Sequence, residues 1–88
     1  MFYDTESTVL DADKSKLCRL LIDLQPFEKT MQFEDDIEID ITARAFCDKK
    51  PEVITSNYLM VGVVVYKIMN IRKWSDYLEC WLYECECD

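Results

Sequence analysis

The chain has 88 residues, of which 50% are hydrophobic and 32% are charged, and this composition predicts one small folded domain spanning residues 1–88. Eighteen acidic residues against 10 basic ones give a net charge of −8, which argues against direct binding of nucleic acid through its phosphates. The absence of histidine excludes histidine-based catalytic triads, histidine metal ligands and histidine pH switches.

The first predicted element is a helix over residues 11–24. Asp11 or Asp13 is suitably placed to cap its start, and Pro26 ends it because the residue before a proline avoids the helical conformation. Four leucines recur at helical spacing and would form one apolar stripe: Leu17, Leu20, Leu21 and Leu24.

The next segment changes to a period of two. Every odd position from Met31 to Cys47 except Asp35 is apolar, which predicts a strand with one dry face and one wet face. A hairpin at residues 34–36 would divide this segment into two strands, and the pattern is compatible with both arrangements. Residues 48–51 then form a turn.

Residues 53–71 are rich in β-branched and aromatic side chains. Both faces are apolar between Tyr58 and Tyr66, which predicts a central strand covered on both sides. Gly62 inside it marks a bulge or the close approach of another backbone.

The last stretch, residues 74–88, has features of a helix and of a strand, and its alternation and aromatic content favour the strand. The predicted fold class is therefore α+β, with one N-terminal helix packed on an antiparallel sheet of three to four strands.

Acidic residues gather in two clusters that make up the predicted partner-binding site. On the predicted strand, alternate carboxylates project from one face about 6.6–6.8 Å apart, a spacing that resembles the phosphates of a nucleic-acid strand. The alternative interpretation is a solvated strand face that keeps the domain soluble. The candidate residues are Glu34, Asp35, Asp36, Glu38, Asp40, Glu84, Glu86 and Asp88.

The odd number of cysteines predicts reduced thiols, several of them acting as small buried hydrophobic residues. The set is Cys18, Cys47, Cys80, Cys85 and Cys87. The alternative is a metal site in which the last three of these cysteines act as thiolate ligands, but their spacing departs from the usual pair of CxxC motifs. We therefore predict no metal and no cofactor.

No catalytic motif is present, so the protein is predicted not to be an enzyme. The longest uncharged segment, residues 53–66, has 14 residues and is too short to span a bilayer, and the acidic N-terminus lacks the features of a signal peptide. These features predict a cytoplasmic protein without membrane contact. Trp74 and Trp81 are candidate anchors of an interface, and Phe2 and Tyr3 are candidates for a homodimer contact.

In size, charge and cysteine content the chain resembles the small inhibitors that phages encode against host defence, among them anti-CRISPR and anti-restriction proteins. That resemblance implies an inhibitor that imitates nucleic acid. The leading hypothesis is a non-enzymatic binding protein that occludes a basic site of a partner, such as a host nucleic-acid-binding complex. The alternatives are a structural or regulatory subunit, similar to an antitoxin or immunity protein, with an apolar and aromatic interface, and a small cysteine metal-binding module.

Overall fold

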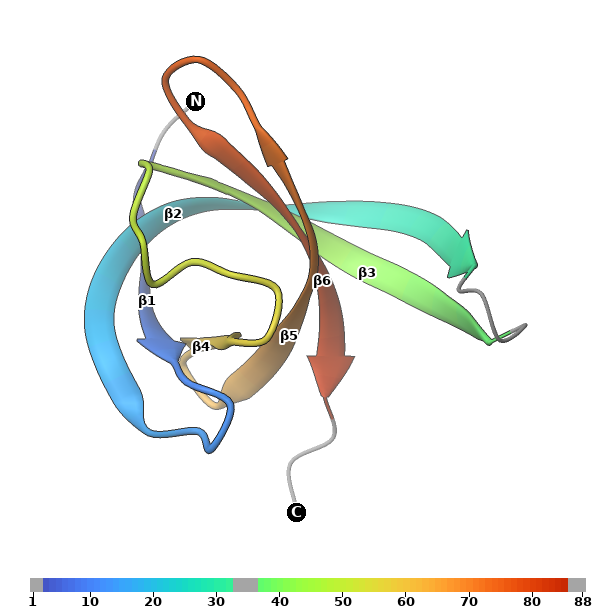
Figure 1. The fold of residues 1–88 in the computed structure, drawn as a ribbon, viewed down its shortest axis with the longest axis horizontal. Coiled ribbons are helices and arrows are strands. Elements are labelled where there is room, and N and C mark those ends of the chain that lie inside the picture. The colour runs from blue at the N-terminus through green and yellow to red at the C-terminus, as the bar shows by residue number, and fades with distance from the viewer. Residues whose placement is uncertain (1–2, 33–36, 86–88) are drawn as a thin grey trace.

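A computed structural model describes residues 3–32 and 37–85, and all regular structure in these ranges is β-strand. The strands close into a barrel in the order β1-β2-β3-β6-β5-β4, with every neighbouring pair antiparallel (Figure 1). The predicted α+β class is therefore wrong. The strands are β1 (Thr5–Leu10), β2 (Lys16–Gln32), β3 (Glu38–Cys47), β4 (Tyr58–Val61), β5 (Val64–Lys73) and β6 (Leu78–Cys85).

The barrel closes because the chain crosses one of its ends between β3 and β4. Residues 48–57 run over the opening, so that β4 pairs with β1 instead of β3 (Figure 1). Val53 in this crossing segment is buried in the core. The strands β4, β5 and β6 then return as consecutive hairpins until β6 pairs with β3, which is a Greek-key order.

Alternate side chains of each strand fill the interior. The small β3 residues Ala43 and Ala45 belong to this core together with Leu82 of the neighbouring β6 and Ile68 of β5. The core comprises Val9, Leu20, Ile22, Ala43, Ala45, Cys47, Val53, Leu59, Ile68, Leu78, Cys80 and Leu82.

The predicted helix over residues 11–24 is instead a turn followed by the first part of β2. Leu20 is buried at strand spacing, whereas Leu17 and Leu21 are 45% and 51% exposed, so the four leucines do not form one face. Asp11 does cap backbone N–H groups, but in a tight turn: its Oδ1 accepts from the amides of Asp13 and Ser15, each at 2.9 Å.

Pro26 does not end its element. It lies within β2 beyond Ile22, the last residue of β2 that pairs with β1, so β2 has a single strand neighbour at that point. A proline is tolerated there because no second neighbour requires its missing N–H group.

The segment predicted as one central strand, residues 53–71, contains a hairpin. Val61 pairs with Val64 around a two-residue turn, and Gly62 adopts a φ of +60° in it. A glycine is favoured at this position because the left-handed conformation is costly for other residues. Gly62 therefore forms a turn, and neither a bulge nor the close approach of another backbone.

The sequence left two alternatives open for the alternating segment and two for the terminal stretch, and the structure shows one of each. Gln32 pairs with Glu38, so the alternating segment is two strands joined by a hairpin; residues 34–36 lie outside the described ranges. The terminal stretch forms β6 over Leu78–Cys85.

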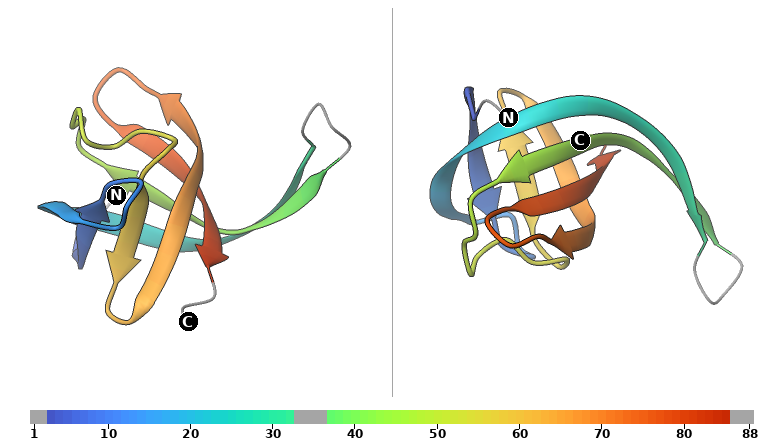
Figure 2. Two further views of the ribbon diagram at one scale, coloured as in Figure 1. Left: turned by 60° about the horizontal axis from the view of Figure 1, so that its bottom comes forward. Right: turned by 90° about the horizontal axis from the view of Figure 1, so that it is seen from above.

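The β2–β3 hairpin is longer than the barrel and projects from it (Figure 2). We call residues 29–32 of β2 and 37–41 the arm. The register shifts between Pro26 and Lys29, a bulge that is typical of a strongly bent strand. Within residues 3–32 and 37–85 no helix is long and apolar enough to cross a membrane.

Candidate functional site

One face of the arm carries carboxylates whose contacts are with neutral groups. Glu38 and Asp40 are exposed and project to the same side of β3. Thr30 Oγ1 donates to Asp40 Oδ1 and Gln32 Nε2 donates to Glu38 Oε1, each at 3.0 Å. Because these donors are uncharged, the two hydrogen bonds do not pair the carboxylates with a cation, and both side chains are exposed to solvent.

The opposite face of the arm is apolar and only partly covered. Ile41 is buried and Ile39 is half-buried, whereas Ile37 is 51% exposed. The predicted dry face is therefore confirmed at Ile41, whereas Ile39 is only half-buried and Ile37 is exposed.

A hollow of about 480 Å³ lies at the root of the arm. Glu28 and Asp40 line it together with Lys29, Thr30 and the beginning of the barrel wall. Two carboxylates and the ammonium group of Lys29 therefore border the same open hollow.

The remaining candidate acids are distributed as follows. Glu84 is exposed on β6, opposite Tyr66 of β5. Because β6 runs antiparallel to β3, with Leu82 opposite Ala43, Glu84 lies at the barrel end from which the arm projects. The other candidates lie outside the described residues: Glu34, Asp35, Asp36, Glu86 and Asp88.

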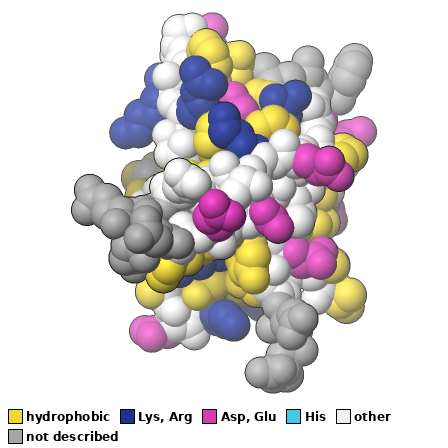
Figure 3. Space-filling model, turned by 90° about the vertical axis from the view of Figure 1, so that its right-hand side faces the viewer, with side chains coloured by type: hydrophobic (Ala, Val, Ile, Leu, Met, Phe, Trp, Pro, Cys, Tyr) yellow, Lys and Arg dark blue, Asp and Glu magenta, His cyan; other side chains and the backbone are white. Residues whose placement is uncertain are grey.

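Lys29 lies in the arm and borders the same hollow as Asp40, whereas three other lysines lie together elsewhere on the barrel. Lys49, Lys50 and Lys73 line a hollow of about 400 Å³ beside Ile54 and Leu78. Viewed from the side of the arm, Lys and Arg side chains gather toward the upper end, and Asp and Glu side chains lie across the middle (Figure 3). Residues 49–73 contain five basic residues and a single acid, Glu52.

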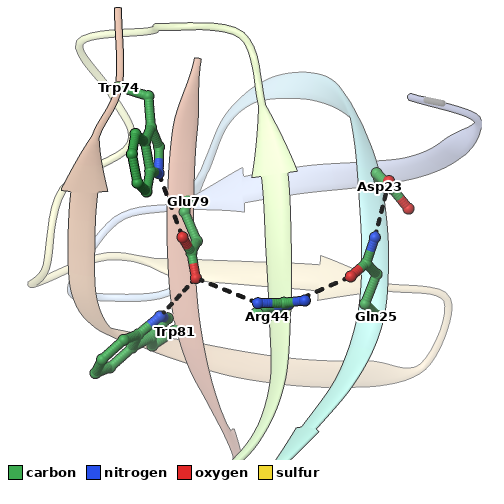
Figure 4. Close-up of polar contacts among 6 residues, drawn as sticks. All are labelled: Asp23, Gln25, Arg44, Trp74, Glu79 and Trp81. Carbon is green, nitrogen blue, oxygen red and sulfur yellow. Dashed lines mark hydrogen bonds and ion pairs between the residues drawn. The ribbon is translucent and has the colours of Figure 1, made fainter. Parts of the chain in front are cut away.

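A buried carboxylate organises the outer surface of the barrel next to the arm. Glu79 is 5% exposed although it lies on the outer side of β6. Its oxygens accept from Trp81 Nε1 at 2.9 Å and Trp74 Nε1 at 3.3 Å, and Oε2 lies 3.7 Å from Arg44 Nη1 (Figure 4). Arg44 and Glu79 form the one ion pair among the described residues.

This contact continues across three strands. Arg44 Nε donates to Gln25 Oε1 at 3.3 Å, and Gln25 Nε2 donates to Asp23 Oδ2 at 3.1 Å (Figure 4). The chain of polar contacts therefore joins β6, β3 and β2 on the outside of the barrel. It provides the donors that a buried carboxylate needs.

Aromatic and cationic side chains cover this polar chain. Phe27 and Trp81 have ring centroids 5.7 Å apart, Lys29 Nζ lies 4.7 Å from the Trp81 ring, and Arg44 Cζ lies 4.9 Å from the Phe27 ring. We call the whole group the outer cluster. It comprises Phe27, Lys29, Arg44, Phe46, Trp74, Tyr77, Glu79 and Trp81.

The outer cluster fixes the base of the arm, because Phe27 lies within the β2 bulge and Lys29 follows it. The sequence indicated two tryptophans as candidate anchors but not this arrangement. The signal that could have revealed it is the alternation itself: Glu79 and Trp81 occupy the positions between the core residues of β6, as Arg44 and Phe46 do on β3.

The described cysteines do not assemble a metal site. Cys47 and Cys80 are fully buried in the core, whereas Cys18 and Cys85 are partly exposed. A hydrogen bond between the Cys47 and Cys80 thiols, together with burial, raises the pKa of Cys80. No group of three or more potential metal ligands occurs among residues 3–32 and 37–85, and Cys87 is outside these ranges.

In comparisons with family models, with curated proteins and with solved structures, no match to this chain was found.

Proposed function

We propose that the protein is a small, non-enzymatic binding protein whose arm occupies a basic, nucleic-acid-binding site of a partner protein in the cytoplasm and blocks it. The observation that carries this proposal is the arm itself. It extends beyond the barrel with Glu38 and Asp40 exposed and without an ion-pair partner among the described residues, and with Ile37 half-exposed.

The two faces of the arm suit different parts of such binding. Carboxylates repeated about every 6.6–6.8 Å along a strand match lysines and arginines that otherwise hold phosphates. Opposite charges accelerate association, and burial of the exposed isoleucine slows dissociation. The outer cluster lowers the entropic cost of binding by holding the base of the arm in one direction.

The test compares two variants that remove the same amount of charge from different places. The first, which we call the arm variant, neutralises the alternating acids of the acidic run 34–40: E34Q, D36N, E38Q and D40N. The matched control neutralises four exposed acids elsewhere: D4N, E6Q, D13N and D76N. Both have a net charge of −4 instead of −8.

Immobilised wild-type protein first captures partners from the native host, with elution along a salt gradient. Each captured protein is then loaded with a labelled nucleic acid that it binds, and displacement of the label is measured. We expect the wild type and the control variant to displace the nucleic acid, and the arm variant to fail while its thermal unfolding remains cooperative. Equal displacement by both variants would refute the proposal.

A second candidate is a regulatory subunit with an apolar interface, and one observation favours it. Leu17 and Leu21 are 45% and 51% exposed on the outer side of β2. Exposed leucines that share a face are typical of an interaction surface. Partner binding that resists salt, survives in the arm variant and is lost in L17S/L21S would support this candidate over the first.

A further inference from the structure

The arm has backbone edges that no described strand covers. β2 pairs with β1 only as far as Ile22, and β3 pairs with β6 only from Ala43 onward. Beyond these residues the two strands pair only with each other among the described strands. Each therefore presents a row of backbone N–H and C=O groups on its outer side, and such a row is a template for another strand.

The two edges differ in how well they accept a strand. The edge of β2 contains Pro26, which has no N–H group, and the bulge between Pro26 and Lys29. Both features obstruct strand pairing. The edge of β3 over residues 38–41 contains neither, and its pairing with β2 is regular. Its Ile39 and Ile41 are β-branched residues, which favour extended structure.

We infer that the β3 edge, residues 38–41, binds an extended segment of the partner as an added strand, and this inference rests on the proposed function. The chemistry of the segment follows from the two faces of β3. Side chains opposite Glu38 and Asp40 fall on the acidic face, and those opposite Ile39 fall on the apolar face. The segment that fits is therefore one in which lysine or arginine alternates with apolar residues.

A second copy of the chain fits this edge less well. Pairing of two β3 edges places the carboxylates of one copy beside those of the other, and like charges on neighbouring strands are destabilising. The net charge of −8 opposes self-association as well. Charge complementarity thus selects a basic, extended segment as the occupant.

The experiment uses an eight-residue peptide of alternating lysine and valine with both termini blocked. Two further peptides carry N-methyl groups on the backbone. In one of them every lysine is N-methylated, and in the other every valine is. N-methylation removes the N–H donors that point to one side of an extended peptide. A fourth peptide has the same composition with its lysines and valines in separate blocks. Binding of each to the full chain is measured by fluorescence anisotropy, with E38Q/D40N as the test variant and E6Q/D76N as its control.

We expect the unmodified peptide and one N-methylated form to bind the wild type, and the other N-methylated form to bind about tenfold or more weakly, since it cannot pair with the edge. The peptide with its lysines and valines in separate blocks should also bind more weakly. The E38Q/D40N substitution should weaken binding of the alternating peptide, whereas E6Q/D76N should not. Equal binding of all four peptides, or binding of none, would overturn strand addition.

The outcomes separate this inference from the proposed function. If all peptides bind the wild type equally while the arm variant fails to displace nucleic acid, strand addition is wrong and the acidic arm still acts through charge. If the N-methylated forms differ as expected but displacement is unaffected by the arm variant, the edge binds strands and the proposed function is wrong. A dimer in sedimentation without peptide, abolished by I39P, would assign the edge to a second copy and overturn the inference.

Discussion

At the scale of single residues, Glu79 shows how a carboxylate can be held on the outer side of a barrel without contact with water. It accepts two indole N–H groups and pairs with Arg44, so its removal leaves the buried Trp81 N–H without its acceptor and breaks the contacts with Trp74 and Arg44. We expect Glu79→Ala to lower the free energy of unfolding by about 2–4 kcal/mol, and Glu79→Gln by about half as much because the amide oxygen still accepts a hydrogen bond. Urea denaturation measures both, with Glu84→Gln as the exposed control. An effect of Glu79→Ala no larger than that of the control would show that the contacts are not stabilising.

The cysteines allow a second prediction at this scale. Cys47 and Cys80 are inaccessible in the core, and the raised pKa of Cys80 keeps its thiol protonated. At pH 8 we expect iodoacetamide to label Cys18 and Cys85 in the folded protein, and to label Cys47 and Cys80 only after unfolding in urea. Mass spectrometry of the labelled peptides distinguishes the sites. Labelling of Cys80 at the rate of Cys85 would contradict the barrel interior described here.

At the scale of elements, substitutions of Gly62 test whether the β4–β5 hairpin depends on this one residue. An added Cβ would contact nothing within 4 Å, so a substitution is opposed by the φ of +60° alone. We expect Gly62→Ala to destabilise the protein by about 1–2 kcal/mol, and Gly62→Asn by less because asparagine tolerates this conformation. Thermal or urea unfolding of the two variants provides the measurement, and equal effects would contradict this account.

The sequence predicts correctly those strands in which apolar and polar residues alternate without interruption. The alternation from Ile39 to Cys47 survives in β3 because one face of that strand lines the core. Residues 16–24 of β2 have the spacing of a helix because Leu17 and Leu21, which face outward, complete a helical stripe with Leu20 and Leu24. Leu20 and Leu21 lie on opposite faces of β2 because side chains alternate along a strand, and the leucine spacing alone does not show that the period there is two.

Barrel closure and the direction of the arm are properties of the whole molecule, and the sequence did not predict either. Closure depends on β1 pairing with β4, two strands that are separated by residues 11–57, more than half of the chain. The arm arises because the β2–β3 hairpin is longer than the barrel requires. The acidic run was visible in the sequence, but its place on a projection was not, because alternation alone cannot show where the core beneath a strand ends.

The arm and the barrel are also separable in energetic terms, which leads to a prediction for the whole molecule. Among the described residues of the arm, Ile41 at its root is the one buried hydrophobic residue. Thr30 and Asp40 are paired across the hairpin, so a two-residue Asn-Gly turn can join them in place of residues 31–39. We expect this shortened chain to unfold cooperatively, with a free energy of unfolding within about 1 kcal/mol of the wild type, since no described residue among 31–39 is fully buried.

The same shortened chain should neither displace nucleic acid from captured partners nor bind the alternating lysine and valine peptide. Calorimetry and the two binding measurements, made on one preparation, then assign stability to the barrel and recognition to the arm. Retained binding would place recognition on the barrel surface, where the exposed leucines of β2 are the alternative. Loss of cooperative unfolding would instead show that the arm is part of the folding unit, because its strands would then be needed to hold β2 and β3 in register within the barrel.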